Sequence, residues 1–183
     1  MRRVAQVLVA TAALCLAGPA LAAAPGQTFA VPGHGSVTLA IPGQWTSELR
    51  QPDDGSPPTV ALKSHAGALF EAYITLLWPV GTADKTFTDD ALEEMVRGAA
   101  QDSESQSTEV TLAIKPLAGT GGKGYFFAAT DKAPKPGEFK YMKQGMLQGS
   151  RVTLAFTILS NDGQEALAQA ALDLVAGAQQ HAQ

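Results

Sequence analysis

Cysteine is nearly absent from this sequence. The single one, Cys15, stands close to the N-terminus. Downstream of it the chain can form no disulfide, no thiolate metal site and no cysteine nucleophile. Leu14 precedes Cys15, whereas the acylated cysteine of a lipoprotein follows a small residue, so we interpret Cys15 as an ordinary apolar residue of an export signal. The folded part must then be held together by its hydrophobic core alone.

Charged residues are also scarce, at 16% of the chain, and none of them form a basic block. The sequence contains 13 Lys and Arg and 17 Asp and Glu, which gives a formal net charge of −4. Without Arg2 and Arg3 the net charge is −6. An acidic chain of this kind is poorly suited to nucleic acid or to an anionic membrane surface. We therefore predict that no nucleic acid is a partner.

Long apolar runs are missing except at the N-terminus. A short basic segment, Met1-Arg2-Arg3, precedes an apolar stretch over residues 4–17, and Ala20-Leu21-Ala22 supplies small residues where a signal peptidase cleaves. The stretch is shorter than the ~20 residues that cross a membrane. These features predict a signal peptide over residues 1–22, a periplasmic or secreted mature protein, and no membrane span after cleavage. A retained interfacial helix is the alternative.

The rest of the chain, residues 23–183, predicts one domain. A chain of about 160 residues buries roughly 70% of its unfolded surface, which is enough for a stable core. No internal repeat or low-complexity tract divides it. We expect a monomer.

Residues 112–160 read as four consecutive antiparallel strands with short connections. The last two are Lys140–Gln148 and Arg151–Ser160, separated by Gly149-Ser150, a two-residue loop typical of a primed-turn hairpin. Period-two alternation predicts further strands over these segments: Gln27–Val31, Ser36–Ile41, Thr59–Lys63, Leu69–Trp78 and Glu109–Lys115.

Two helices are predicted. Thr88 is the expected N-cap of the first, followed by Asp89 and Asp90, where the helix dipole favours carboxylates. Asn161 begins the second, with Gln164 three residues later as in a capping box. Because most connections between strands are too short for parallel crossovers, we predict an α+β fold. Its mainly antiparallel sheet is flanked by helices on both faces, an α/β/α sandwich.

The order of these elements resembles a known family. A leading hairpin runs into Ile41-Pro42-Gly43-Gln44-Trp45, a helix lies near Leu92, a glycine turn leads into an aromatic strand, and a strand–helix pair closes the chain. This pattern is similar to the PsbP-like superfamily, which includes extrinsic photosystem proteins and bacterial exported proteins of the DcrB type. The resemblance covers nearly all of residues 23–183. It implies a binding or accessory role and no enzymatic activity.

One group of glycines has the spacing of a dinucleotide-binding motif. Gly119, Gly121 and Gly124 have the G-x-G-x-x-G spacing of dinucleotide-binding loops, but such a loop needs a helix after it to receive the pyrophosphate. A predicted strand, Tyr125–Thr130, follows instead. We therefore expect a hairpin turn and no cofactor.

Histidine offers little for metal binding or catalysis. His34 and His65 lie in predicted turns and His181 in the tail, and no two of them have the spacing of a ligand pair. We predict exposed turn histidines and no metal site. A hydrolase that uses His34 or His65 with loop carboxylates is an alternative.

One segment is locally basic and carries aromatic residues. We take its members as the candidate partner-binding site: Lys132, Lys135, Phe139, Lys140, Tyr141 and Lys143. Phe139, Tyr141 and Lys143 are expected on one face of a strand. The competing interpretation is ordinary protection of an edge strand by lysine and proline.

These observations predict an exported, non-enzymatic binding or accessory protein of the cell envelope, which acts through contacts with an envelope protein. A carrier of a small apolar ligand, held between sheet and helix, is the second possibility.

Overall fold

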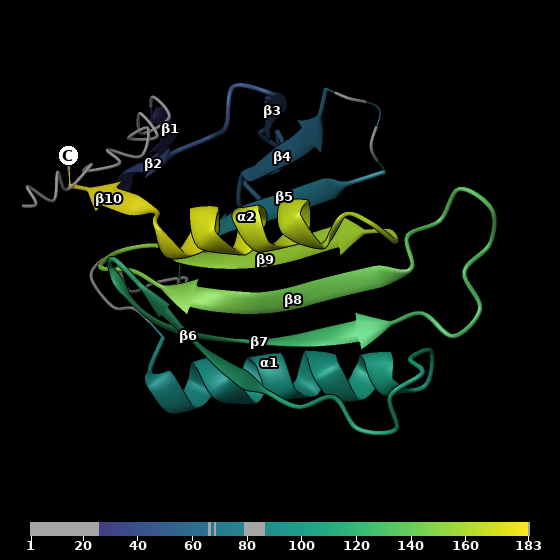
Figure 1. Ribbon diagram of the computed structural model, residues 1–183. Coiled ribbons are helices and arrows are strands. Elements are labelled where there is room, and N and C mark those ends of the chain that lie inside the picture. The colour runs from purple at the N-terminus through teal and green to yellow at the C-terminus, as the bar shows by residue number, and fades with distance from the viewer. Residues whose placement is uncertain (1–25, 66, 68, 79–86, 183) are drawn as a thin grey trace, which may run out of the picture.

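The computed structural model describes residues 26–65, 67, 69–78 and 87–182. The predicted signal peptide, residues 1–22, lies outside the described residues. Seven strands form the larger sheet, in the spatial order β3-β4-β5-β9-β8-β7-β6 (Figure 1). In chain order these strands are β3 Trp45–Arg50, β4 Thr59–Ser64, β5 Glu71–Leu77, β6 Lys115–Gly119, β7 Gly122–Thr130, β8 Tyr141–Gln148 and β9 Thr153–Ser160.

A smaller sheet has the order β1-β2-β10 and consists of β1 Gln27–Val31, β2 Gly35–Leu39 and β10 Gln179–His181. Helix α1, Asp89–Glu104, precedes β6, and helix α2, Glu165–Ala176, follows β9. Every pair of neighbouring strands is antiparallel. The predicted α+β class with antiparallel sheet is therefore confirmed. Neither helix in the described part of the chain has the length and apolar character needed to span a membrane.

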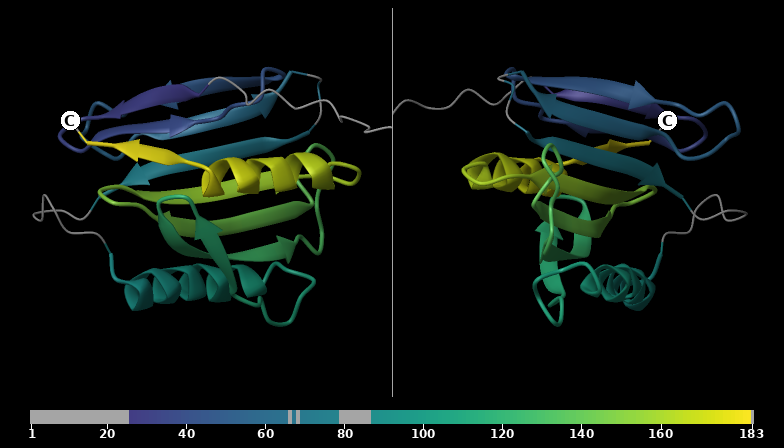
Figure 2. Two further views of the ribbon diagram at one scale, coloured as in Figure 1. Left: turned by 60° about the vertical axis from the view of Figure 1, so that its left-hand side comes forward. Right: turned by 90° about the vertical axis from the view of Figure 1, so that its right-hand side faces the viewer.

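The two sides of the larger sheet are built differently (Figure 2). On the side that we call the α2 side, Ile74 of β5 and Phe156 of β9 pack with Leu172 and Val175 of α2. The smaller sheet joins the same core through its buried residues Phe29, Val31, Val37 and Leu39. This side holds most of the buried hydrophobic residues.

The opposite side, which we call the α1 side, has a smaller core. Phe127 and Ala129 of β7 pack there with Val96 and Ala100 of α1. The finer expectation of an α/β/α sandwich is not confirmed, because α1 packs mainly on β7 and β8, and the smaller sheet shares the α2 side with α2. Among the described strands, β3 and β10 are additions that the sequence pattern did not predict.

The helix starts differ in how closely they follow the prediction. Thr88 caps α1 as expected, with its Oγ1 accepting a hydrogen bond from the Ala91 amide at 3.3 Å. Helix α2 begins at Glu165, four residues later than predicted. The Gln164 side chain still accepts from the Asn161 amide at 3.2 Å, so the capping contact forms in the turn before the helix.

The strand predicted over Glu109–Lys115 is wrong. Only its last residue belongs to a strand. Val110, which the alternation places on the inward face with Leu112 and Ile114, is 91% exposed. Glu109, which the same alternation places on the outward face, accepts hydrogen bonds from the backbone amide and hydroxyl of Thr130. These polar contacts fix the segment in an irregular path, and Leu112 alone is fully buried as predicted.

The two-residue primed turn predicted between β8 and β9 is also wrong. Gln148 pairs with Thr153, which leaves a four-residue connection over residues 149–152. The Gln180 side chain of β10 accepts from the amides of Arg151 and Val152 at 3.1 and 3.2 Å and donates to the Val152 carbonyl at 2.6 Å. A residue far along the chain thus stabilises this turn.

Candidate binding site

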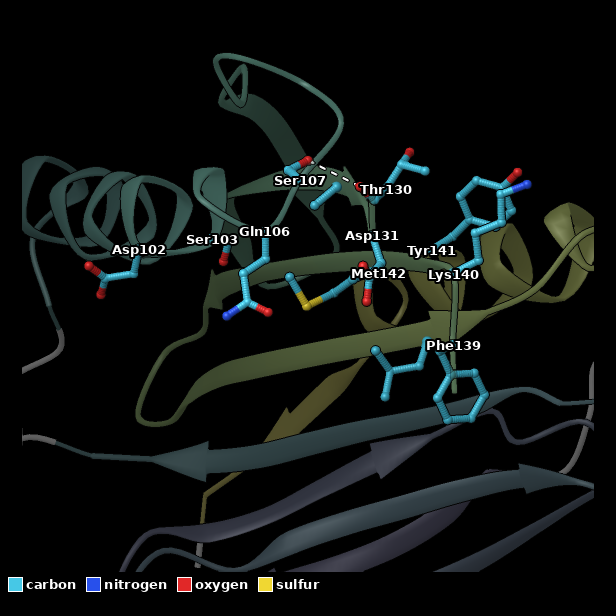
Figure 3. A pocket seen from close by; sticks show the side chains of 12 residues that line it. Asp102, Ser103, Gln106, Ser107, Thr130, Asp131, Phe139, Lys140, Tyr141 and Met142 are labelled. Atoms are coloured by element: carbon cyan, nitrogen blue, oxygen red, sulfur yellow. Dashed lines mark hydrogen bonds between the residues drawn. The ribbon is translucent and has the colours of Figure 1, made fainter. Parts of the chain in front are cut away.

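A pocket of about 340 Å³ lies at the end of the larger sheet, where the last turn of α1, the end of β7 and the start of β8 meet. We call it the loop pocket, because the loop over residues 131–140 borders it. Asp102 and Gln106 line it from α1 and the turn after it, Phe139 lines it from the opposite side, and Met142 lies between them (Figure 3).

Backbone hydrogen bonds fix the loop against α1. The Lys132 amide donates to the Gln106 carbonyl at 3.0 Å, and the Asp131 amide donates to the Lys140 carbonyl at 2.8 Å. The Asp131 side chain accepts from the Ala133 amide at 2.8 Å. The walls of the loop pocket are therefore held by the fold.

Glu109 anchors the irregular segment beside this pocket. Burial alone would raise the pKa of its carboxyl group, but hydrogen bonds from Ser107 and from the amide and hydroxyl of Thr130 lower the pKa from 4.5 to about 2. The carboxylate also accepts from the Thr108 hydroxyl at 3.1 Å. Glu109 is thus ionised at neutral pH and ties residues 107–109 to the end of β7.

Lys140 and Tyr141 form a separate cluster at the rim. Lys140 Nζ lies 2.9 Å from Asp162 Oδ1, and the Tyr141 hydroxyl donates to the same oxygen at 2.6 Å. These two contacts, with the tyrosine hydrogen bond first, lower the pKa of the Asp162 carboxyl group. In Figure 3 the side chains of Lys140 and Tyr141 extend together, away from Asp102 and Gln106.

The structure brings together only part of the predicted site. Phe139, Lys140 and Tyr141 line the loop pocket. Lys132 and Lys135 are exposed on the loop; the Lys132 ammonium group donates to the Ser105 carbonyl.

Phe139, Tyr141 and Lys143 were expected to share a strand face. Tyr141 and Lys143 do so in β8, but Phe139 precedes the strand, so the expectation is wrong for Phe139. Lys143 lies on the α2 side, 3.4 Å from Gln169 Oε1, and burial lowers the pKa of its ammonium group.

Sequence reasoning missed the acidic half of the pocket. Asp102 and Asp131 line it, so its lining is less basic than the sequence segment suggested. The serine-rich polar run at the end of α1 was the available signal, but nothing in it shows that the loop over 131–140 packs there.

The other candidate groups lie apart from the pocket. His34 stacks on Trp78 with ring centroids 4.8 Å apart, and His65 and His181 are exposed. No group of three metal-ligating side chains occurs within the described ranges. The glycine motif forms the turn between β6 and β7, where Gly119 pairs with Gly122, as the hairpin interpretation predicted.

No protein-family model matches the chain, and no curated protein matches it in sequence. A solved structure does share its architecture. Cyanobacterial PsbP (CyanoP) from Synechocystis sp. PCC 6803 superposes with a TM-score of 0.52 over 92% of this chain and 99% of that chain. The fold is PsbP-like. At 14% identity this PsbP-like likeness concerns the fold alone, and it confirms the predicted resemblance at that level.

Proposed function

We propose that this PsbP-like chain is an exported, non-enzymatic binding protein of the cell envelope, of the bacterial DcrB type. In this proposal the signal peptide over residues 1–22 directs it to the periplasm or outside the cell. It contacts another envelope protein through the loop pocket.

One observation carries the proposal: the loop pocket combines a partly exposed aromatic ring with apolar neighbours and a polar rim. Phe139 shares the pocket with Met142 and Leu159, while Asp102 and Asp131 supply carboxylates. Aromatic residues and methionine are enriched at the centres of protein interfaces, and polar groups surround them. The fixed loop keeps this surface formed before a partner arrives, which reduces the entropy lost on binding.

The chemistry beside the pocket favours binding over catalysis. Ser107 donates its hydroxyl hydrogen bond to Glu109, which is the closest approach to a nucleophile–base pair in this region. A carboxylate with a pKa of about 2 accepts a proton poorly at neutral pH, so Glu109 would activate the hydroxyl weakly. Three hydrogen bonds to Ser107 and Thr130 give it a sufficient structural role.

A carrier of a small apolar ligand is the second candidate. The pocket volume of about 340 Å³ falls at the lower end of the range for small-molecule sites. Native mass spectrometry of the mature protein, purified gently from its own cells, separates the two: a retained small molecule supports the carrier, and a protein adduct after mild crosslinking supports the partner.

Site-specific photo-crosslinking tests the proposal directly. A photoreactive amino acid at position 139 is expected to capture an envelope protein in the producing cells. The same amino acid at position 49 is the control, because Leu49 is 40% exposed on the edge strand β3. Equal capture from both positions, or none from position 139, contradicts the proposal.

Substitutions at the same two positions measure how much each side chain contributes to the affinity for the partner. Phe139→Ser is expected to weaken the captured complex by roughly 30-fold or more, as for an interface hot spot. Leu49→Ser, a matched change from a large apolar residue to serine, should leave affinity unchanged.

A further inference from the structure

The loop pocket has a neighbouring hollow on the α1 side. A second hollow of about 370 Å³ lies beside α1, bounded by Met95 and Ala99 of the helix and by Met146 of β8. The linings of the two hollows follow each other along the same elements, from Ala99 to Asp102 on α1 and from Thr157 to Leu159 on β9. We call the combined feature the α1 groove.

The length of the groove corresponds to about two helical turns. Along α1, the eight residues of rise from Met95 to Ser103 span about 12 Å. Along β9, the four steps from Ala155 to Leu159 span about 13 Å. The two walls are therefore nearly equal in length.

The floor of the groove favours a helix over an extended peptide. Its strands β5, β9 and β8 are adjacent interior strands of the sheet, with their backbone groups paired to neighbours on both sides. A peptide therefore cannot add there as another strand and must bind through side chains.

The usual distance between packed helices matches the spacing of the strands in this floor. Helices pack 8–10 Å apart, which is close to two strand spacings of about 4.8 Å. Because α1 lies over β7 and β8, a helix beside it would lie over β9 and β5. The side chains there include the small residues Thr75, Ala155 and Thr157, with the Tyr73 ring beside Thr157.

The walls of the groove are apolar and adaptable. Met95 is 37% exposed on α1, and Met142 and Met146 are partly buried on β8. Methionine side chains adjust their shape to different apolar partners.

One end of the groove is acidic. Asp102 and Asp131 line it, and neither forms a salt bridge with a described Lys, Arg or His. The nearest lysine in the lining, Lys140, is paired with Asp162 instead. A partner with a lysine or arginine at this end would be electrostatically complementary to the two carboxylates.

We infer that the α1 groove receives an amphipathic α-helix of an envelope protein. Its apolar face packs on Met95, Met142 and Met146, and a lysine or arginine lies against Asp102 and Asp131. This inference rests on the proposed function and specifies the chemistry of the partner.

Photo-crosslinking from the groove floor tests it. A photoreactive amino acid at position 157 is expected to capture a segment with apolar residues at helical spacing and a basic residue at one end, identified by mass spectrometry of the crosslinked peptide. Position 166 on α2, where Ala166 is exposed, is the control. Capture of nothing, of an acidic or non-helical segment, or of a small molecule alone at position 157 overturns the inference.

The same experiment separates the inference from the proposed function. Capture of a protein at position 139 with none at position 157 leaves the binding protein and removes the helix-receiving groove. Capture at neither position removes both.

Charge reversal provides the second test. Asp102→Lys together with Asp131→Lys is expected to lower capture from position 157 at least roughly tenfold, because like charges would meet at the acidic end. Exchanging the partner's basic residue for aspartate should restore capture. Asp53→Lys, in the exposed turn before β4, is the control. Unchanged capture by the double variant contradicts the inference.

Discussion

The two sides of the larger sheet use neighbouring residues of the same strand for different purposes. Phe156 of β9 points to the α2 side and is 2% exposed in the main core. Thr157, the next residue, points to the α1 side and lines the α1 groove. The α2 side is closed by a helix and a second sheet, whereas α1 leaves part of its side accessible.

This difference indicates that the α2 side of the sheet mainly stabilises the fold, while the α1 side is available for binding. Burial of apolar area on the α2 side supplies most of the hydrophobic stabilisation. The α1 side keeps Met95 and the small residues of β9 accessible, which contributes less to folding and provides a surface for binding. The predictions below test this division, from the largest expected effect to the smallest.

Phe156→Ala should cost about 3–5 kcal/mol in the free energy of unfolding, because it leaves a cavity in the main core. Thr157→Ala, one residue away, should change it by less than about 0.5 kcal/mol. Urea unfolding of both variants checks this. Similar losses for the two would contradict the division between the sides.

Gln180→Ala should cost about 1–3 kcal/mol, because it leaves the Arg151 and Val152 amides without their acceptor in a partly buried turn. Faster hydrogen exchange at Val152 is expected as well. Gln179→Ala, at an exposed position of the same strand, is the control and should have little effect. If Gln180→Ala and Gln179→Ala change the free energy of unfolding equally, the hydrogen bonds from the Gln180 side chain do not stabilise the β8–β9 turn.

Glu109→Gln should cost about 1–2 kcal/mol at pH 7, since charge-assisted hydrogen bonds to Thr130 and Ser107 are weakened. The pKa of Glu109 is lowered in the folded state, so its contribution is present above pH 4.5 and lost as the pH falls toward 2. Unfolding measured across this range should show a shallower acid loss for the variant. Glu94→Gln, on the exposed side of α1, is the matched control.

Thr88→Ala should cost about 1 kcal/mol by removing the N-cap of α1. Hydrogen exchange should rise in α1 and stay unchanged in α2, because the two helices pack in different clusters. Thr88→Ser keeps the hydroxyl and should preserve protection. Equal loosening of both helices would show that the sides are coupled.

The sequence predicts the fold best where local chemistry and packing agree. The hairpin of β1 and β2 and the Thr88 cap follow from alternation and from a side chain that bonds its own backbone. Strand β3 was missed because its sequence is largely polar and exposed, as an edge strand allows. Strand β10 was missed because three polar residues carry no hydrophobic period.

The candidate site shows the same limit. The aromatic and basic composition pointed to Phe139, Lys140 and Tyr141, which do line the loop pocket. Asp102 could not be added, because its approach to a loop 30 residues downstream depends on how α1 packs. Lys143 does not line the pocket, because it lies two residues further along β8 than Tyr141 and contacts Gln169 of α2.

Cysteine labelling tests the division of the sheet most directly. Cys15 is the one cysteine of the sequence and lies in the predicted signal peptide. If that peptide is removed as proposed, Thr157→Cys and Ala166→Cys each give a protein with a single thiol. Maleimide labelling is then compared between purified protein and intact envelopes. We predict that position 157 is protected in the envelope, at least severalfold, while position 166 reacts equally in both. Equal labelling of position 157 in both states would contradict a binding role for the α1 side.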